Sequence, residues 1–184
     1  VPGYVEESYR RIAEGLAPIH RAGVVPIVLG GDHSIVLPEL RAAAAVHGAL
    51  ALVQFDAHPD TWESYFGQKH THGTPFRRAV EEGLVKPERS IQVGMRGSLY
   101  DSDDWNAARE LGFELISTDE VREIGISETI ARTRERVGDA KAYVSFDVAF
   151  VDPAFAPGTG TPEIGGFTSR EAQEFVRGLA GLDI

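Results

Sequence analysis

The stretch that decides the fold is residues 52–60, LVQFDAHPD. Its first four residues are mostly apolar and predict the end of a short buried strand, and the polar residues after them predict a loop. In that loop Asp56, His58 and Asp60 stand two residues apart, a spacing that in extended geometry directs their side chains toward one side. We therefore expect three ligand-type side chains to converge where the strand ends.

The same alternation of short apolar runs and helical periodicity extends over the rest of the chain. Strands are expected at 24–29 (VVPIVL), 49–55 (ALALVQF), 90–95 (SIQVGM), 113–117 (FELIS) and 142–146 (AYVSF). Helices are expected near 4–21, 35–46, 74–82, 103–111, 128–137 and 169–179. The pattern predicts the α/β class, a three-layer α/β/α arrangement around a mostly parallel sheet.

Length and composition fit one domain over residues 1–184 of the 184-residue chain. There is no cysteine, which excludes disulfides and thiolate metal sites and leaves His, Asp and Glu as strong metal ligands. A net charge of −10 argues against a nucleic-acid partner and is compatible with a small cationic substrate. No apolar run reaches the length of a membrane span, and the start VPGYVEESYRR does not resemble a signal peptide, so a cytoplasmic location is expected.

Three polar clusters follow three of the expected strands: GGDHS at 30–34, DAHPD at 56–60 and DVAFVDP at 147–153. Ligands of open α/β sheets bind at the carboxyl ends of the strands, so His33 and Asp147 are expected to join the three residues of DAHPD. Two imidazoles and three carboxylates without sulfur suit manganese, with zinc, iron, cobalt or nickel as substitutes. Two such ions about 3.5–4 Å apart share one hydroxide in known hydrolases.

Each of these residues also has a purely structural interpretation. An Asp-x-His-x-Asp segment alone could be a loop of turn and capping residues, and Asp147 alone could be an ordinary strand-end residue. Asp32 is interpreted as a turn residue and Ser34 as a helix N-cap. The placement of the candidates at three strand ends on one edge of one sheet is what favours the metal site.

Four longer blocks carry a resemblance to a known family: GGDHS, FDAHPDTW at 55–62, THGTPF at 71–76, and SFDVAFVDPAFAPGTGTPEIGG at 145–166. In order and spacing they resemble the signature blocks of the ureohydrolase (arginase/agmatinase) family, and with IQVGMRGSLY they are most similar to bacterial agmatinases and guanidinobutyrases. The resemblance implies an arginase-like fold and a binuclear Mn²⁺ centre. It also implies hydrolysis of a guanidino compound to urea and an amine, and a homo-oligomer, a trimer or hexamer. Among such substrates the acidic net charge favours agmatine, which would give putrescine.

Matching positions carry the family's metal-binding roles over to this sequence. One ion would be bound by His33, Asp56, Asp60 and Asp147. The other would be bound by Asp56, His58 and Asp147, so that Asp56 and Asp147 would bridge the two ions.

Other roles follow from the same resemblance. His72 matches a histidine proposed to shuttle protons or contact substrate, and Asp60 is a weaker candidate for passing a proton to the leaving nitrogen. His70 is expected on the loop surface, and Asp152 in a structural role. Gly158 and Gly160 are expected either to let the backbone pass close to the site or to form a tight turn.

The sequence departs from the family pattern where Asp-x-Asp is expected and Asp147-Val148-Ala149 stands instead. A methyl group cannot ligate a metal, so a weakened or empty second metal position is expected. The N- and C-terminal parts of the family fold, including a strand with a substrate-side glutamate, are expected to be missing, and Glu163 is not that glutamate. The alternative is a non-catalytic subunit of the same fold that acts in assembly or ligand binding. A deacylase of related fold is disfavoured because its motifs differ from DAHPDTW and APGTGTPE.

Overall fold

The computed structural model describes residues 4–97 and 103–184, so the beginning of VPGYVEESYRR and the end of IQVGMRGSLY lie outside the described residues. The chain divides into two compact units, each built from segments that are distant in sequence. Unit 1 comprises Val1–Leu50 and Asp60–Lys86, and unit 2 comprises Ala51–Pro59 and Pro87–Ile184. A single ureohydrolase domain over 1–184 stays a prediction.

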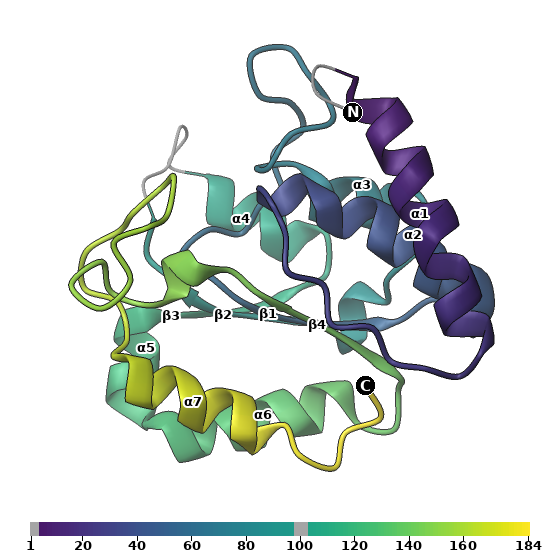
Figure 1. Ribbon diagram of the computed structural model, residues 1–184. Coiled ribbons are helices and arrows are strands. Elements are labelled where there is room, and N and C mark those ends of the chain that lie inside the picture. Colours follow the sequence, from purple (N-terminus) through teal and green to yellow (C-terminus); the bar gives the residue numbers. More distant parts are fainter. Residues whose placement is uncertain (1–3, 98–102) are drawn as a thin grey trace. The chain divides into compact units, whose positions relative to one another are not determined.

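Unit 2 contains a parallel sheet of four strands in the order β3-β2-β1-β4 (Figure 1). The strands are β1 (Ala51–Phe55), β2 (Ile91–Met95), β3 (Glu114–Ser117) and β4 (Ala142–Phe146). All three strand pairs are parallel, as the alternating pattern predicts, and the register places Phe55 opposite Phe146. The expected mostly parallel α/β sheet is confirmed, and two of the polar clusters follow β1 and β4 at its carboxyl edge.

Both faces of this sheet are covered within unit 2. Figure 1 shows α5 (Thr118–Ile124), α6 (Ile126–Val137) and α7 (Ser169–Gly178) on one face. The main core lies there, where Val53 and Phe55 of β1 pack with residues of these helices. On the opposite face, Ala108 of α4 (Asp104–Glu110) packs against Met95 and Leu115. Side chains alternate between the two faces along each strand, which is why both faces are apolar.

Unit 1 is helical, with α1 (Val5–Arg21), the 3-10 helix η1 (His33–Ile35), α2 (Val36–His47) and α3 (Pro75–Glu81). The α2 residues Leu37 and Leu40 are fully buried. Arg41 of α2 donates to both carboxylate oxygens of Glu82, just after α3, at 2.7 and 2.6 Å. The other 3-10 helices, η2 (Pro87–Arg89) and η3 (Val148–Phe150), belong to unit 2.

The strand expected at 24–29 is wrong for this structure. These residues form no strand, and Ile27 and Leu29 are 88% and 92% exposed. A strand needs a neighbour for its backbone N–H and C=O groups, and no strand within the described residues pairs with this segment. Helix α5 was not among the expected elements, because the short sequence TDEVREI shows too little periodicity.

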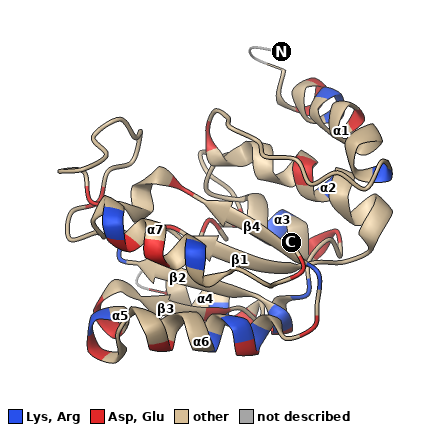
Figure 2. Cartoon of the chain, turned by 60° about the horizontal axis from the view of Figure 1, so that its bottom comes forward, with Lys and Arg blue, Asp and Glu red and all other residues tan. Residues whose placement is uncertain are grey.

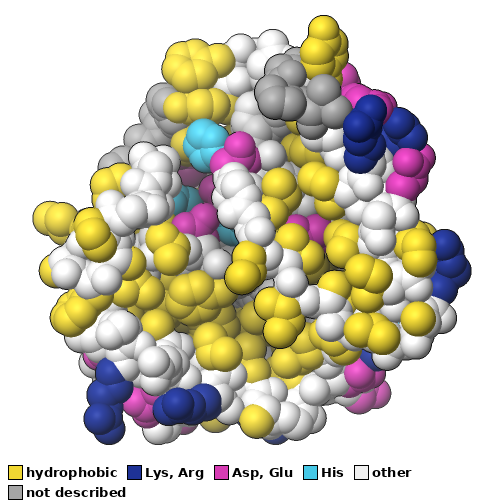
Figure 3. Space-filling view, in the orientation of Figure 1, with side chains coloured by type: hydrophobic (Ala, Val, Ile, Leu, Met, Phe, Trp, Pro, Cys, Tyr) yellow, Lys and Arg dark blue, Asp and Glu magenta, His cyan; other side chains and the backbone are white. Residues whose placement is uncertain are grey.

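The surface is mixed in character. Figure 2 shows basic and acidic residues interspersed along α6 and α7. Figure 3 shows hydrophobic side chains on the face seen in Figure 1. Exposed hydrophobic residues of unit 2 include Phe146, Val148 and Phe155. Among the helices of the described residues, none combines the length and the apolar character that crossing a bilayer requires.

Candidate metal centre

Asp56 and Asp147 lie side by side at the carboxyl edge of the sheet. Each directly follows the last residue of its strand, and those last residues, Phe55 of β1 and Phe146 of β4, are paired in the register. The Asp147 N–H donates to the Phe55 carbonyl at 2.9 Å, which continues the ladder by one residue. One carboxylate oxygen from each aspartate lies within 4.8 Å of the other. The structure therefore brings together the two residues expected to bridge metal ions.

His58 brings an imidazole close to Asp56. Its Nδ1 lies 3.4 Å from Asp56 Oδ1, and its backbone N–H donates to that same oxygen at 3.0 Å. Asp56 is fully buried and the His58 side chain is 16% exposed. Asp56 and His58 thus lie close together, as the spacing in DAHPD predicts for these two of its three ligand-type residues.

Two buried glutamines support this loop from inside the sheet. Gln54 Nε2 donates to Asp56 Oδ2 and to the His58 carbonyl, both at 2.9 Å. Gln92, its neighbour on β2, donates from Nε2 to Gln54 Oε1 at 2.6 Å and to the Pro59 carbonyl at 2.7 Å. The sequence interpretation missed both residues, although an amide in the middle of each apolar strand was a visible signal.

Replacing Gln92 by leucine should destabilise the protein by about 1–3 kcal/mol, because the Gln54 amide oxygen and the Pro59 carbonyl would lose their donor in a buried setting. Urea unfolding measures the loss. Gln173→Leu, at an exposed position of α7, is the matched control and should change stability by no more than about 0.5 kcal/mol. Equal stability of the two variants would show that the glutamine pair does not support the loop.

The end of β2 passes close behind Asp56, and a glycine makes this possible. Gly94 has φ 98°, and a Cβ there would lie 2.8 Å from the Asp56 carbonyl oxygen and 2.5 Å from the Phe150 ring. Both the left-handed backbone and the lack of space exclude a side chain at this position. This close approach fixes the Asp56 backbone against the neighbouring strand.

Unit 1 holds a second pair of the expected ligands, His33 and Asp60. His33 Nδ1 lies 2.7 Å from Asp60 Oδ2, and both side chains are nearly buried, at 7% and 8% exposure. The His33 ring also packs edge-on against Phe76, with centroids 5.2 Å apart. The N-cap of η1 is Asp32, which accepts from the Ser34 N–H at 2.8 Å, so the capping role expected of Ser34 belongs to Asp32.

Asp60 adopts a backbone conformation that is uncommon for a residue with a side chain. Its φ is 51°, in the left-handed region, and its carbonyl accepts from the Phe76 N–H at 3.2 Å. Asp and Asn are enriched among non-glycine residues in this region. Pro59 and this turn together redirect the chain out of the strand end.

His72 and His70 lie in the loop of unit 1 before α3. His72 is half-buried against the edge of Tyr65, with ring centroids 5.2 Å apart. His70 is half-buried against Tyr9 at 5.5 Å, rather than on the loop surface as expected. The catalytic role of His72 stays a prediction.

Ala149 occupies the position where the family pattern has an aspartate. Its side chain is fully buried, its N–H donates to Asp147 Oδ1 at 2.7 Å, and its carbonyl accepts from Arg96 at 2.7 Å. The backbone at this position is therefore held beside a candidate ligand, and a methyl group stands where a further oxygen donor would come. Burial lowers the pKa of Arg96, and nearby carboxylates partly oppose this shift.

The loop between η3 and α7 closes on Asp152. This carboxylate accepts from the N–H groups of Ala154 at 2.9 Å, Gly165 at 2.8 Å and Gly166 at 3.0 Å. These bonds, the one from Ala154 foremost, lower the pKa of Asp152, so its role is structural as expected. Within the part of the chain that the structure describes, the close approach considered for Gly158 and Gly160 does not occur, because a Cβ at either glycine would meet no atom of residues 4–97 and 103–184 within 4 Å.

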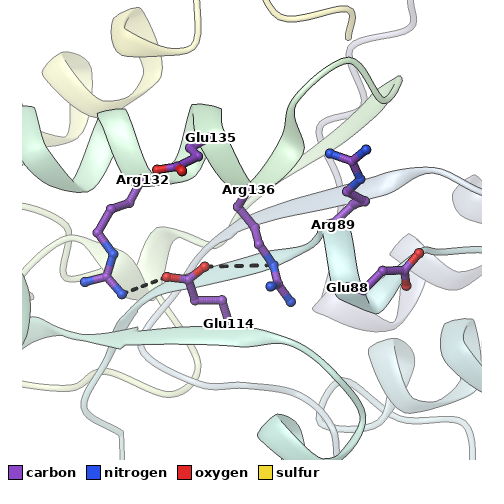
Figure 4. A pocket seen from close by; sticks show the side chains of 6 residues that line it. All are labelled: Glu88, Arg89, Glu114, Arg132, Glu135 and Arg136. Atoms are coloured by element: carbon purple, nitrogen blue, oxygen red, sulfur yellow. Dashed lines mark hydrogen bonds and ion pairs between the residues drawn. The ribbon is translucent and has the colours of Figure 1, made fainter.

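A separate pocket of about 420 Å³ lies at the amino ends of β2 and β3 (Figure 4), whereas Asp56 and Asp147 follow the carboxyl ends of their strands. Its lining alternates in charge: Glu88, Arg89, Glu114, Arg132, Glu135 and Arg136. Arg132 bridges Glu114 and Glu120, each at 2.7 Å. Opposite charges that already satisfy one another indicate a structural ionic network rather than a ligand site.

The donors of unit 2 fit a divalent cation. Two carboxylates whose oxygens lie within 4.8 Å repel each other when both are ionised, and a cation between them removes this repulsion. An imidazole nitrogen with carboxylate oxygens and no sulfur suits hard and borderline ions such as Mn²⁺. The residues present therefore match the metal that the sequence implies.

The fold and these side chains define an α/β protein with carboxylates and imidazole gathered at the carboxyl edge of a parallel sheet. The chain belongs to the arginase family, which it matches over residues 1–184. It is 53% identical over 179 residues to guanidinopropionase of Pseudomonas aeruginosa and 46% identical over 178 residues to guanidinobutyrase of the same organism, each match covering 97% of this chain and 56% of the relative. It is also 45% identical over 178 residues to the mitochondrial agmatinase of Gallus gallus, covering 97% of this chain and 52% of that relative.

The solved structures to which the chain is similar include members of the same family. Proclavaminate amidino hydrolase from Streptomyces clavuligerus superposes with a TM-score of 0.92 at 38% identity, over 99% of this chain and 60% of that chain. Arginase from Bacillus caldovelox gives a TM-score of 0.88 at 29% identity, over 97% of this chain and 64% of that one. The arginase-like fold is thereby confirmed, and the chain spans about half the length of the curated relatives it matches, 56% for guanidinopropionase.

Proposed function

We propose that the protein is a metal-dependent hydrolase that cleaves a guanidino compound to urea and an amine. The observation that carries this proposal is the pair of carboxylates at one edge of the sheet, Asp56 and Asp147, whose oxygens lie within 4.8 Å of each other. The imidazole of His58 lies 3.4 Å from Asp56. Membership of the arginase family and relatives named for guanidino compounds support it.

The proposed metal is Mn²⁺, held by the five residues His33, Asp56, His58, Asp60 and Asp147. In this assignment His33, Asp56, Asp60 and Asp147 serve one position, while Asp56, His58 and Asp147 contribute to the other. Bound metal would generate hydroxide near neutral pH and polarise the substrate. His58 presents Nδ1 toward the Asp56 carboxylate, 3.4 Å from Oδ1.

Two further residues are proposed to handle protons. His72 would contact substrate or carry a proton, since imidazoles exchange protons near neutral pH, and Asp60 is the second candidate for passing a proton to the leaving nitrogen. Asp60 Oδ2 lies 2.7 Å from His33 Nδ1.

The substrate is proposed as a small guanidino compound. The preference for agmatine rests on the net charge of −10, which favours a cation. The relatives at 53% and 46% identity are named for guanidino acids, which carry a carboxylate as well. Both kinds of substrate therefore belong in the test.

The test is urea release by the whole protein after metal removal with EDTA and after reloading with Mn²⁺. Agmatine, 3-guanidinopropionate, 4-guanidinobutyrate and arginine form the panel. We expect urea from at least one compound, dependent on Mn²⁺ and lost in His58→Asn, while Asp139→Asn at an exposed residue keeps it. No urea from any of the four, also after Ala149→Asp, would refute a ureohydrolase for these substrates.

The second candidate function is a non-catalytic subunit of the same fold, and the buried Ala149 is the observation that favours it. Such a subunit would assemble with an active partner or bind a ligand. Purified protein that releases urea as a homo-oligomer excludes this alternative. Urea release only after a partner from the same cell is added supports it.

Assembly and location are proposed on the family resemblance and the sequence. We infer a homo-oligomer, a trimer or hexamer, located in the cytoplasm, without a nucleic-acid or membrane partner. Some relatives are mitochondrial, for example the agmatinase of Gallus gallus, so localisation by a fluorescent fusion is informative. Light scattering of the purified protein determines the oligomeric state.

A further inference from the structure

The imidazole of His58 has a second carboxylate on its far side. While Nδ1 lies 3.4 Å from Asp56, Nε2 lies 3.4 Å from Glu163 Oε1. The two side chains are mostly buried, at 16% and 21% exposure. Glu163 comes from the loop before α7, more than one hundred residues after His58 in the chain, so local sequence does not impose this pairing.

The loop that carries Glu163 is fastened to the carboxyl edge of the sheet by Arg96. Its guanidinium donates to the Glu163 carbonyl at 2.9 Å and to the Ile164 carbonyl at 3.1 Å. The same guanidinium also donates to the carbonyls of Ala149 at 2.7 Å and Gly94 at 3.3 Å. The Glu163 backbone is thereby tied to the same strand ends that carry the candidate ligands.

The backbone of Gly97 lies against the same edge of the His58 ring, beside Cδ2 and Nε2. A Cβ at Gly97 would lie 2.3 Å from His58 Cδ2 and 2.6 Å from Nε2, and the Gly97 N–H donates to the Ala57 carbonyl at 2.8 Å. The ring therefore lies against Gly97 and has little freedom to turn. Nε2 on this edge lies 3.4 Å from Glu163 Oε1.

We propose that Glu163 is a positioning residue for His58, rather than a ligand or a substrate contact. Its carboxylate accepts the Nε2–H, which fixes the tautomer and leaves the Nδ1 lone pair directed at the metal position beside Asp56. In metal sites the second nitrogen of a ligating histidine commonly donates to a carboxylate, which orients the ring and increases its basicity. The proposal rests on the proposed metal centre.

The first test is the Mn²⁺ affinity of variants of the whole protein, measured by calorimetric titration. Glu163→Ala should weaken binding by about 10–100-fold, the loss typical of such an outer partner. Glu163→Gln keeps an acceptor oxygen and should restore the affinity to within a few-fold of the unchanged protein. Asp139→Asn, which removes an exposed carboxylate of the same unit, is the control and should bind Mn²⁺ normally.

The second test reads the hydrogen bond itself. In protein loaded with diamagnetic Zn²⁺ and labelled with ¹⁵N-histidine, His58 should show a protonated, slowly exchanging Nε2, and Glu163→Ala should speed this exchange. Glu163→Ala that binds Mn²⁺ as tightly as the unchanged protein overturns the positioning role alone. If the unchanged protein binds neither ion, the metal centre fails and the role of Glu163 fails with it.

Discussion

Replacing Ala149 by aspartate should raise the tightly bound Mn²⁺ from one to two ions per chain and increase urea release at least about 10–100-fold. The reason is the missing oxygen donor at the second metal position. Ala149 is fully buried, and its backbone N–H is bonded to Asp147 Oδ1 at 2.7 Å, so a carboxylate added here begins next to a ligand that is already in place. Loss of an outer partner of a metal ligand costs about that factor, and a direct ligand should contribute at least as much.

Mass spectrometry of the protein after loading with excess Mn²⁺ and gel filtration counts the ions. Ala180→Asp adds the same charge at an exposed position and should change neither the metal content nor the rate. If the unchanged protein already retains two ions, the deficit assigned to Ala149 does not exist. If Ala149→Asp folds and still holds one ion, the position does not reach the metal.

Replacing Asp147 by asparagine should change stability in opposite directions with and without metal. Without metal, the variant should be more stable by about 1–2 kcal/mol, because it removes the repulsion between carboxylates whose oxygens lie within 4.8 Å. Asparagine keeps an oxygen to accept the Ala149 N–H. With Mn²⁺ at about 100 times its dissociation constant, the unchanged protein should gain about 2.7 kcal/mol, most of which the variant loses.

Urea unfolding in EDTA and in Mn²⁺ measures both effects on the same two proteins. The order of stability should reverse between the two conditions. Asp139→Asn removes an exposed carboxylate and should show no reversal. A variant that is less stable than the unchanged protein in EDTA would show that Asp56 and Asp147 do not repel each other, and the argument for a cation between them would fail.

Much of the candidate metal site could be predicted because its aspartates directly follow the ends of strands. The apolar runs that form β1 and β4 are short and clear, and parallel pairing places the residues after them at one edge. The neighbourhood of Asp56 and Asp147 follows from these two facts alone. His58 follows from its spacing to Asp56.

What could not be predicted depends on contacts between distant segments. The approach of Glu163 to His58, and the hold of Arg96 on the Glu163 loop, join residues separated by 105 and 67 positions. Gln54 and Gln92 were hidden in runs interpreted only for their hydrophobicity. At residues 24–29 a strand was predicted that the structure does not have. The β-branched residues there favour a strand, but they do not supply a neighbouring strand for its backbone hydrogen bonds.

The left-handed backbone of Asp60, with φ 51°, restricts which experiments on this residue can be interpreted. Alanine would remove the carboxylate and also place a side chain without polar atoms in a conformation it disfavours, so chemistry and strain would change together. Asparagine tolerates the same conformation and changes only the charge. Two independent requirements therefore limit which residues are tolerated at position 60: a left-handed backbone and a carboxylate side chain. A deep mutational scan would show this position as sensitive without separating the two causes.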